Sequence, residues 1–373
     1  MSRRVRHAAV ALAVVVLIAV GPIAPAGAAP AQVPERFTGT VAEFYVVPDP
    51  LPPGVPGDLI RVQDVASGGG TATVRIMYHS RDAQDRDRAV TGLVTYPTAP
   101  PPDGGWPVVS HANGTVGLAS VCALSRAGRP VSTVGVAGVG VASDYIGMGP
   151  VGETHPYLSR PSEGHSVIDA VRAARNLTET GAGARWLAIG GSQGGHGAMS
   201  AHELGGTYAP ELDLLGTVSL APAAMFERTY GGIDDIVSRI VTAMGLYGGA
   251  TEHPEIDPAD YASPELAAAA AEVFPDQCLG DIITTLTPLA LSDAFFAHDP
   301  RTTEPARSVM LANDVGHVAA DAPLLLVSGT ADQRVVIERA RDLYDRLCTT
   351  GQVTEYTEYL GATYDDIGVY AGP

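Results

Sequence analysis

The sequence predicts an α/β protein whose mostly parallel sheet begins with antiparallel strands and is interrupted by a helical insertion. The segments Leu59 to Val65, Thr71 to Tyr78 and Ala89 to Tyr96 alternate or are rich in β-branched residues, and Gly-rich or charged turns separate them, as in an antiparallel meander. After Pro107, short apolar runs alternate with helix-like segments, which indicates parallel strands joined by helices. From Pro222 to Pro305 no strong strand pattern occurs, and an excursion of about 85 residues is too long for a loop.

Five short apolar runs are the predicted buried strands of the parallel part. They are Pro107–Ser110, Val139–Ala142, Trp186–Ile189, Thr217–Leu220 and Pro323–Val327. Between the second and the third, Ser166 to Leu177 has apolar residues at the spacing of a packed helix face. Within the insertion, Ile233 to Met244 and the Ala-rich Pro264 to Phe274 are predicted helices. We expect the insertion to cover one end of the sheet, as a lid over a substrate pocket.

These patterns divide the chain into five segments. We predict a signal peptide at 1–28, a Pro-rich lead-in at 29–57, a first part of the core at 58–221, a helical cap at 222–310 and a second part of the core at 311–373. The lead-in is expected to be extended, because residues 30 to 57 contain seven prolines and show neither a helical nor a strand period. One large domain with an insertion fits the length as well as two domains do.

The N-terminus has the features of a secretory signal. Arg3, Arg4 and Arg6 precede the apolar run Ala8 to Val20, which is 13 residues long, and a small-x-small cleavage site ends at Ala28. A membrane span needs about 20 apolar residues. We therefore expect a secreted, extracellular protein cleaved near Ala28, and the alternative is an uncleaved anchor.

All 23 basic residues are arginine, so the chain contains no lysine. This excludes a P-loop lysine, a Schiff-base lysine and a Ser-Lys dyad, because each of these needs an ε-amine. The formal net charge is −18, and it becomes −21 when the three N-terminal arginines are removed. Nucleic-acid binding needs clustered positive charge, and anionic membrane surfaces repel an acidic protein. We expect neither nucleic-acid binding nor stable membrane insertion.

The three cysteines, Cys122, Cys278 and Cys348, are too few and too scattered for a metal cluster. Export favours one disulfide. The positions by themselves leave three pairings open.

The strongest chemical signal is a serine at a strand-to-helix turn. The predicted strand Trp186–Ile189 leads into Gly190-Gly191-Ser192-Gln193-Gly194-Gly195, and small residues follow in a predicted helix. A serine on so sharp a turn needs neighbours without Cβ atoms, and the helix N-terminus aims backbone N–H groups at developing oxyanion charge. Ser192 is therefore the candidate nucleophile. The alternative is an ordinary glycine-rich turn, and the missing lysine disfavours a phosphate-binding loop.

Two further segments supply candidate partners for Ser192. The turn at Gly114-Thr115 follows the first parallel strand, and a backbone N–H there would join that of Gln193 as an oxyanion donor. Taken alone, this segment would be a routine turn. The last predicted strand leads to Asp332, the candidate acid, at the carboxyl edge of the sheet where ligands of open α/β sheets bind.

Together these features resemble the secreted lipase family of α/β-hydrolases, which includes bacterial secretory lipases and the fungal lipase A type. The resemblance covers about residues 55 to 365. It rests on Asn113-Gly114-Thr115-x-Gly117…Cys122, Asp144-Tyr145-x-Gly147, His155-Pro156-Tyr157-Leu158, the helix Asp169 to Arg175, Gly190 to Gly195, and Gly329 to Asp332 followed by Leu343…Leu347-Cys348…Gly351. These motifs are far more specific together than the serine motif is by itself.

The resemblance implies an α/β-hydrolase fold and hydrolysis of carboxylic esters, acylglycerols included, as in lipid catabolism. The substrate would be a small-molecule or lipid ester, and no metal or organic cofactor would be needed. The resemblance also implies a Cys122–Cys278 disulfide, which leaves Cys348 free.

The chain departs from the family pattern at two places. The oxyanion loop of the family usually has His-Gly-Thr where this chain has Asn113-Gly114-Thr115, and Tyr364 occupies the position expected for the triad histidine. The last histidine is His317, so none follows Asp332 and the order Ser…Asp…His cannot be completed. A tyrosine cannot replace the histidine at neutral pH, because its unperturbed pKa is about 10. The chain also ends at Pro373, nine residues after Tyr364, where a closing helix is expected.

Four other histidines are candidates for the base. His111, His155 and His317 are predicted to be hydrogen-bonded loop residues. His196 lies one helical turn beyond Ser192 and is predicted to point away from it. None is assigned as the base.

Three functional hypotheses follow. The first is a secreted serine ester hydrolase, in which Ser192 attacks, Asp332 orients a histidine, and Gln193 with Gly114-Thr115 stabilises the oxyanion. The second is a catalytically impaired relative that binds a lipid or ester, or an altered or truncated copy of an active enzyme, because of Tyr364 and the early stop. The third is a secreted peptidase on the same scaffold.

Overall fold

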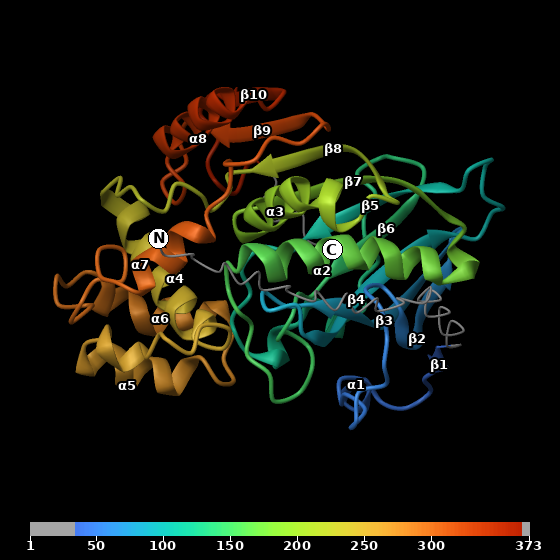
Figure 1. Cartoon of the computed structure of the whole chain (residues 1–373), viewed down its shortest axis with the longest axis horizontal. Coiled ribbons are helices and arrows are strands. Elements are labelled where there is room, and N and C mark those ends of the chain that lie inside the picture. Colours follow the sequence, from blue (N-terminus) through green and yellow to red (C-terminus); the bar gives the residue numbers. More distant parts are fainter. Residues whose placement is uncertain (1–33, 368–373) are drawn as a thin grey trace, which may run out of the picture. The chain divides into compact units, whose positions relative to one another are not determined.

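The computed structural model describes residues 34–367, and the predicted signal peptide, the first residues of the lead-in and the last six residues lie outside them. Ten strands form one mixed sheet in the order β1-β2-β3-β4-β6-β5-β7-β8-β9-β10 (Figure 1). The strands are β1 (Glu35–Arg36), β2 (Leu59–Gly68), β3 (Thr71–Arg81), β4 (Asp87–Pro97), β5 (Trp106–Ala112), β6 (Val139–Ser143), β7 (Ala182–Gly191), β8 (Asp213–Leu220), β9 (Leu324–Gly329) and β10 (Thr354–Tyr359).

The strand directions confirm the predicted fold class. Strands β2, β3 and β4 pair antiparallel, as the predicted meander requires, and β4 is also antiparallel to β6. Every pair from β6 across to β10 is parallel. The five predicted buried strands are confirmed as β5 to β9, although β7 begins four residues before Trp186.

Two helices cover the central strands. Helix α2 contacts β3, β5 and β6, and helix α3 contacts β7 and β8 (Figure 1). Val167, Val171 and Ala198 from these helices are fully buried, and they pack in one core cluster with strand residues such as Trp186. The helices of the described chain are α1 (Val41–Phe44), α2 (Arg160–Asn176), α3 (Gln193–Tyr208), α4 (Gly232–Gly249), α5 (Pro264–Val273), α6 (Leu279–Ala290), α7 (Ala306–Ala312) and α8 (Ile337–Thr350).

Helix α2 begins six residues before the predicted start at Ser166. Its first turns bury polar side chains, among them Ser162 and Glu163, so the apolar periodicity that marks the rest of the helix is missing there. A proline at Pro161, within the first two positions of the helix, suits a helix start because its fixed φ is already helical.

The lead-in is less extended than predicted. Strand β1 pairs with β2, and the one-turn helix α1 follows. A capping box forms this turn: the Thr40 hydroxyl accepts a hydrogen bond from the Glu43 N–H, and the Glu43 carboxylate accepts one from the Thr40 N–H. The local hydrogen bonds outweigh the proline-rich composition at this point.

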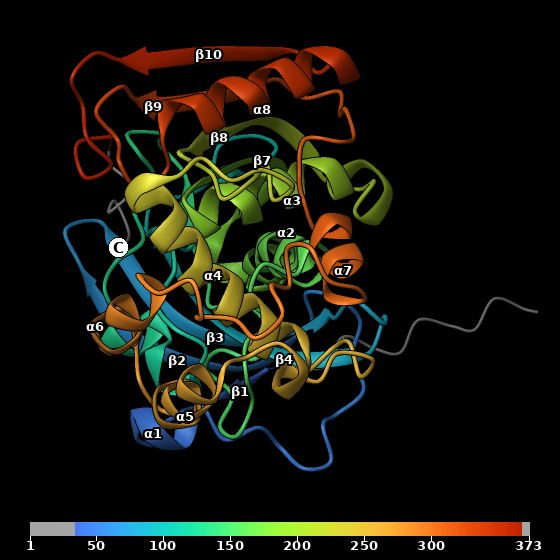
Figure 2. The same cartoon turned by 90° about the vertical axis from the view of Figure 1, so that its left-hand side faces the viewer.

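Helices α4 to α7 lie between β8 and β9 and gather at one end of the sheet (Figures 1 and 2). Two of them were predicted, as α4 and α5, whereas α6 and α7 were not. Side chains of α4, α5 and α6 form their own core cluster, in which Leu118, Tyr157 and Leu158 of the preceding loops take part. The segment boundaries and the lid function remain predictions.

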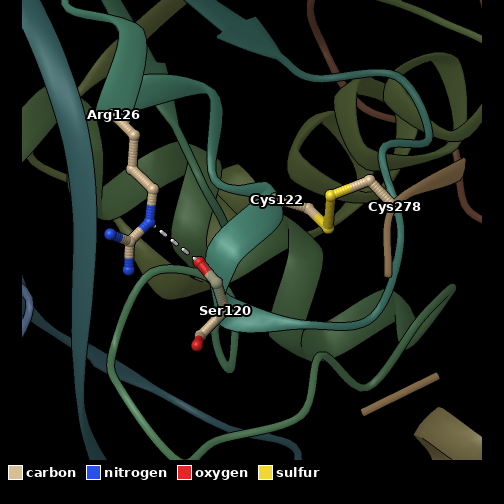
Figure 3. The surroundings of a disulfide bond; sticks show 4 residues. All are labelled: Ser120, Cys122, Arg126 and Cys278. Atoms are coloured by element: carbon tan, nitrogen blue, oxygen red, sulfur yellow. Dashed lines mark hydrogen bonds between the residues drawn. A yellow bond between two sulfur atoms is a disulfide. The ribbon is translucent and has the colours of Figure 1, made fainter. Parts of the chain in front are cut away.

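A disulfide joins this helical segment to the rest of the chain. Cys122 lies at the end of the 3₁₀ turn η1 (Ser120–Cys122) and is bonded to Cys278 at the N-cap of α6, the pairing implied by the resemblance (Figure 3). Backbone pairing accompanies it, because Gly117 forms a β-bridge with Cys278. Cys348 is free and exposed. None of the helices within 34–367 combines the length and apolar character that crossing a bilayer requires.

Candidate active site

Ser192 occupies a strained turn between β7 and α3. Its backbone has φ 58° and ψ −121°, a conformation that costs a non-glycine residue about 1–3 kcal/mol. Hydrogen bonds hold the turn, since the Ser192 N–H donates to the Leu220 carbonyl over 2.9 Å and the Ala223 N–H donates to the Ser192 carbonyl over 3.0 Å. A Cβ atom at Gly190 would overlap the carbonyl oxygen of Gly194, which explains a glycine before the serine.

Ser192 is half-buried and lines a cavity under α4. The space between the cavity walls, open solvent included, is about 1060 Å³. One wall is a ridge of α4 formed by Val237, Val241, Gly245 and Gly249, which succeed each other every four residues and so span about 18 Å of helix. The cavity is therefore elongated along α4 and opens onto the serine.

The predicted oxyanion loop adjoins the serine turn. A Cβ atom at Gly114 would lie 3.6 Å from the Gly191 carbonyl oxygen. Asn113 is buried and fixes the loop, since its side-chain amide donates to the Ser143 carbonyl over 2.7 Å and its own carbonyl accepts from the Tyr145 hydroxyl over 2.9 Å.

The side chain of Thr115 is also held, by a 2.7 Å hydrogen bond between its hydroxyl and that of Tyr157. Gln193 is the first residue of α3, where a backbone N–H has no acceptor within the helix. The sequence candidates Gln193, Gly114 and Thr115 thus come from two segments that lie together, and their role as oxyanion donors stays a proposal.

Asp332 follows β9 and is only 5 % exposed. Its Oδ1 accepts hydrogen bonds from the N–H groups of Arg334 and Val335, at 2.8 and 2.9 Å. Its Oδ2 is buried and has no hydrogen-bond partner among residues 34–367. Burial raises the pKa of Asp332, although the two backbone hydrogen bonds oppose the shift.

Tyr364 contacts Arg334, which follows Asp332 by two residues. The guanidinium carbon of Arg334 is 4.9 Å from the centroid of the Tyr364 ring, and an Arg334 nitrogen is 3.2 Å from a carboxylate oxygen of Asp365. Burial raises the pKa of Tyr157, and an electrostatic interaction with Tyr364 adds to that shift. Tyr364 thus interacts with Arg334 and lies within electrostatic range of Tyr157.

Within residues 34–367, no histidine ring is hydrogen-bonded to Ser192 or Asp332. His111 contacts the Ser132 carbonyl at 2.6 Å, and His317 lies 3.9 Å from Asp314. His155 is fully buried between the Ile146 carbonyl and the Gln193 side chain. His196 is fully buried, and its ring contacts Glu163. That none of the four histidines is the base stays a prediction.

Three further residues of the site were not predicted from the sequence. Glu163, buried next to Gln193, belongs to the stretch where α2 lacks apolar periodicity, and a charged residue within a helix packed on the sheet was a usable signal. Arg334 and His253 line the cavity, and no local pattern marks them. No group of three His, Cys, Asp or Glu side chains in the part of the chain the structure covers is arranged to hold a metal ion.

A family model described as "Secretory lipase" matches residues 132–364, which is more than half of the chain and includes Ser192, Asp332 and Tyr364. The chain belongs to the secretory lipase family. Membership makes it a lipase- or esterase-type hydrolase of carboxylic esters. No protein of curated function matches the chain significantly.

Solved structures of lipases and esterases share the fold of this family member. The rice cell wall degrading esterase LipA from Xanthomonas oryzae superimposes with a TM-score of 0.71 at 18 % identity, over 85 % of this chain and 95 % of that one. Candida antarctica lipase A gives a TM-score of 0.69 at 16 % identity, over 88 % of this chain and 82 % of that one. A putative hydrolase from Legionella pneumophila gives 0.65 at 17 % identity, over 81 % and 86 %. At these identities the likeness shows the α/β-hydrolase fold.

Proposed function

We propose that the chain is a secreted serine ester hydrolase that cleaves small-molecule or lipid esters, acylglycerols included, through an acyl-Ser192 intermediate. The observation that carries the proposal is the positive-φ turn that directs Ser192 to an elongated cavity, with the Gly114 loop beside it. Secretion is supported by the N-terminal arginines and apolar run, and by the Cys122–Cys278 disulfide.

The reaction would use the groups around the turn as follows. The Ser192 hydroxyl attacks the ester carbonyl, and the carbonyl oxygen becomes an oxyanion that accepts hydrogen bonds from the N–H of Gln193 and from an N–H of the Gly114-Thr115 turn. Collapse of the tetrahedral intermediate releases the alcohol and leaves the acyl-serine. Water then attacks the acyl-serine and releases the carboxylic acid.

The cavity along α4 suits the acyl part of such a substrate. Ala223, Ala224, Phe226 and Val335 contribute to its lining together with the α4 ridge that begins at Val237. Apolar walls bind a hydrocarbon chain because the chain leaves water on entering them. This lining also favours esters of fatty acids over peptides as substrates.

The proton of Ser192 needs an acceptor, and Asp332 would act by orienting one. Tyr364 is in the position where the family has a histidine, and Asp332 Oδ2 has no hydrogen-bond partner among residues 34–367. Loss of a triad member costs about four orders of magnitude in kcat, and binding with the oxyanion donors still gives about 10³–10⁴-fold over water. We expect slow turnover from the unmodified chain, with solvent taking the proton.

These same observations favour a second candidate function, a pseudohydrolase that binds lipid or ester ligands without turning them over. Hydrolysis of p-nitrophenyl esters by the unmodified chain, by Ser192→Ala and by Tyr364→His separates the two. We expect weak Ser192-dependent hydrolysis by the unmodified chain and at least a hundred-fold gain in Tyr364→His, since general-base catalysis contributes about 10²–10⁴-fold.

The outcomes of this comparison are distinct. No gain in a folded Tyr364→His variant means that position 364 is not the place of the base. Hydrolysis that is unchanged in Ser192→Ala rejects Ser192 as the nucleophile. Fast hydrolysis by the unmodified chain rejects the pseudohydrolase.

A further inference from the structure

A fully buried network of polar side chains adjoins the serine turn through Gln193, the residue after Ser192. The side-chain amide nitrogen of Gln193 is 2.7 Å from Oε1 of Glu163 and 2.7 Å from Nε2 of His155. The other oxygen of Glu163 is 2.7 Å from Nδ1 of His196, whose Nε2 is 2.8 Å from the Asn313 carbonyl oxygen. The side chains of Gln193, Glu163, His155 and His196 all have an exposure of 0 %.

The neighbours of each atom fix where the protons are. Both ring nitrogens of His196 face acceptors, a carboxylate and a carbonyl, so both carry protons and the ring is a cation. Burial would lower the pKa of His196, and the charge and hydrogen bond of Glu163 raise it instead. For Glu163 the opposite holds: burial would raise its pKa, and the His196 charge lowers it.

The orientation of the Gln193 amide follows from the same reasoning. Nδ1 of His155 donates to the Ile146 carbonyl over 2.8 Å, which leaves Nε2 as the ring nitrogen that can accept. Only the NH₂ group of Gln193 can donate to this nitrogen and to Glu163 at once, because the amide oxygen would repel the carboxylate. The amide oxygen is left buried without a hydrogen-bond partner among the residues described.

The network continues to the other half of the proposed oxyanion hole. The ring of His155 stacks on that of Tyr145, with 5.4 Å between centroids and 10° between planes. The Tyr145 hydroxyl donates to the backbone carbonyl of Asn113, immediately before Gly114. A continuous series of contacts therefore links Gln193, which carries the first candidate donor, to the Gly114 loop, which carries the second.

We propose that the side chains of Gln193, Glu163 and His155 are positioning residues that fix the two oxyanion donors relative to each other. This inference rests on the proposed function of Ser192. A buried amide oxygen without a hydrogen bond, as in Gln193, lowers the stability of the folded protein. Features that cost stability in this way are found most often at functional sites. Glu163 comes from α2, and it contacts both Gln193 and the His196 cation of α3. The position of the Gln193 donor therefore depends on α2 as well as on α3.

The test compares ligands with and without a tetrahedral centre. An alkyl boronic acid forms a covalent, tetrahedral, anionic adduct with a serine hydroxyl, whereas the 1-alkanol of equal chain length only fills the cavity. Affinities of both are measured by calorimetry for the unmodified full chain, Ser192→Ala, Gln193→Leu and Glu163→Gln. The matched control is Ser200→Ala, which removes a buried hydroxyl from α3 that bonds only the His196 carbonyl among the described residues.

We expect Gln193→Leu and Glu163→Gln to weaken boronic acid binding at least about ten-fold, because a misplaced donor loses most of its effect on the oxyanion. Alkanol affinity should change less than about two-fold in both, and Ser200→Ala should leave both affinities unchanged. A purely structural role would lower both affinities together. Circular dichroism confirms the fold, and if Glu163→Gln does not fold, Gln193→Leu still decides the question.

The outcomes distinguish a failure of the positioning role from a failure of the proposed function. If boronic acid binding depends on Ser192 but Gln193→Leu retains it, the positioning role is wrong and the proposed function stands. If binding by the unmodified chain equals that of Ser192→Ala, the proposed function and this inference both fall.

Discussion

Gly194 packs directly against the backbone carbonyl of Ala112, so closely that a Cβ atom on Gly194 would overlap the carbonyl oxygen. Ala112 is the last residue of β5 and leads into the loop with Gly114. The start of α3 and the proposed oxyanion loop are therefore in backbone contact, and no side chain fits between them.

Replacing this glycine should disrupt the site. In Gly194→Ala, α3 or the 112–114 loop must shift, so we expect a loss of stability of about 1–3 kcal/mol, as for overpacked core positions, with loss of any Ser192-dependent hydrolysis. Gly206→Ala is the control, because a Cβ atom at this exposed position of the same helix meets nothing within 4 Å. That variant should gain up to about 1 kcal/mol from alanine's helix propensity. Urea titrations measure both, and equal stability of the two variants contradicts the contact.

An ion pair between Asp234 of α4 and Arg339 of α8 fixes the helical segment above the cavity. The closest oxygen and nitrogen are 2.7 Å apart, and the side chains are only 2 % and 8 % exposed. Asp234→Ala leaves the arginine charge buried, so we expect a cost of about 3–5 kcal/mol. The control is Arg341 of the same helix α8, whose exposed ion pair with Glu358 of β10 is screened by solvent, so Arg341→Ala should cost far less stability. A similar loss in both variants, measured by denaturant unfolding, would show that Asp234 does not anchor α4.

The Cys122–Cys278 disulfide closes a long loop, since the two cysteines are 156 residues apart in sequence. The double variant Cys122→Ser/Cys278→Ser is expected to lose about 2–5 kcal/mol, because its unfolded chain regains the freedom that the cross-link removes. Cys348→Ser removes a free, exposed thiol and should stay within about 0.5 kcal/mol of the unmodified chain. Thermal unfolding with and without a reductant provides the measurement, and a double variant as stable as the oxidised protein argues against the cross-link.

Stability should fall between pH 4 and pH 7 because of Asp144. Burial raises the pKa of Asp144 to about 6, although hydrogen bonds from Ser125 and Thr91 oppose the shift. Because the folded pKa lies above the unfolded value of about 3.9, the stabilisation is complete below pH 4 and is lost as the pH rises through 6. The difference of about two pKa units corresponds to about 3 kcal/mol.

The substitution Asp144→Asn should flatten this slope. Asp169, whose burial also raises its pKa to about 6, keeps a part of it. Urea unfolding from pH 4 to pH 7.5 tests the difference between the two proteins. Parallel stability curves would mean that Asp144 does not titrate in this range.

The sequence was informative wherever structure depends on neighbours along the chain. The turn at Ser192 was predictable because its glycines are adjacent to the serine, and Asp332 because it follows an apolar strand. Helix α6 was missed, since threonines and Pro288 weaken its pattern. Strand β10 was not predicted, because this edge strand consists of exposed and half-buried residues and has no apolar run.

The surroundings of the nucleophile could not be predicted in the same way. Glu163 and Gln193 are 30 residues apart in sequence and meet only because α2 and α3 pack side by side. Arg334 and Tyr364 are in contact although α8 and β10 lie between them in the sequence. A pairing of this kind depends on tertiary contacts, and a single sequence carries no local signal for it.

The bridge between Gly117 and Cys278 has a consequence for how the site is completed. The Leu279 N–H also donates to the Val116 carbonyl over 2.8 Å. The segment that follows Gly114 is therefore hydrogen-bonded to the start of α6. The helical segment is thus a structural component of the loop. Proteolytic removal of that segment would not expose a finished catalytic centre, because it would take away the backbone partner on which the loop is built.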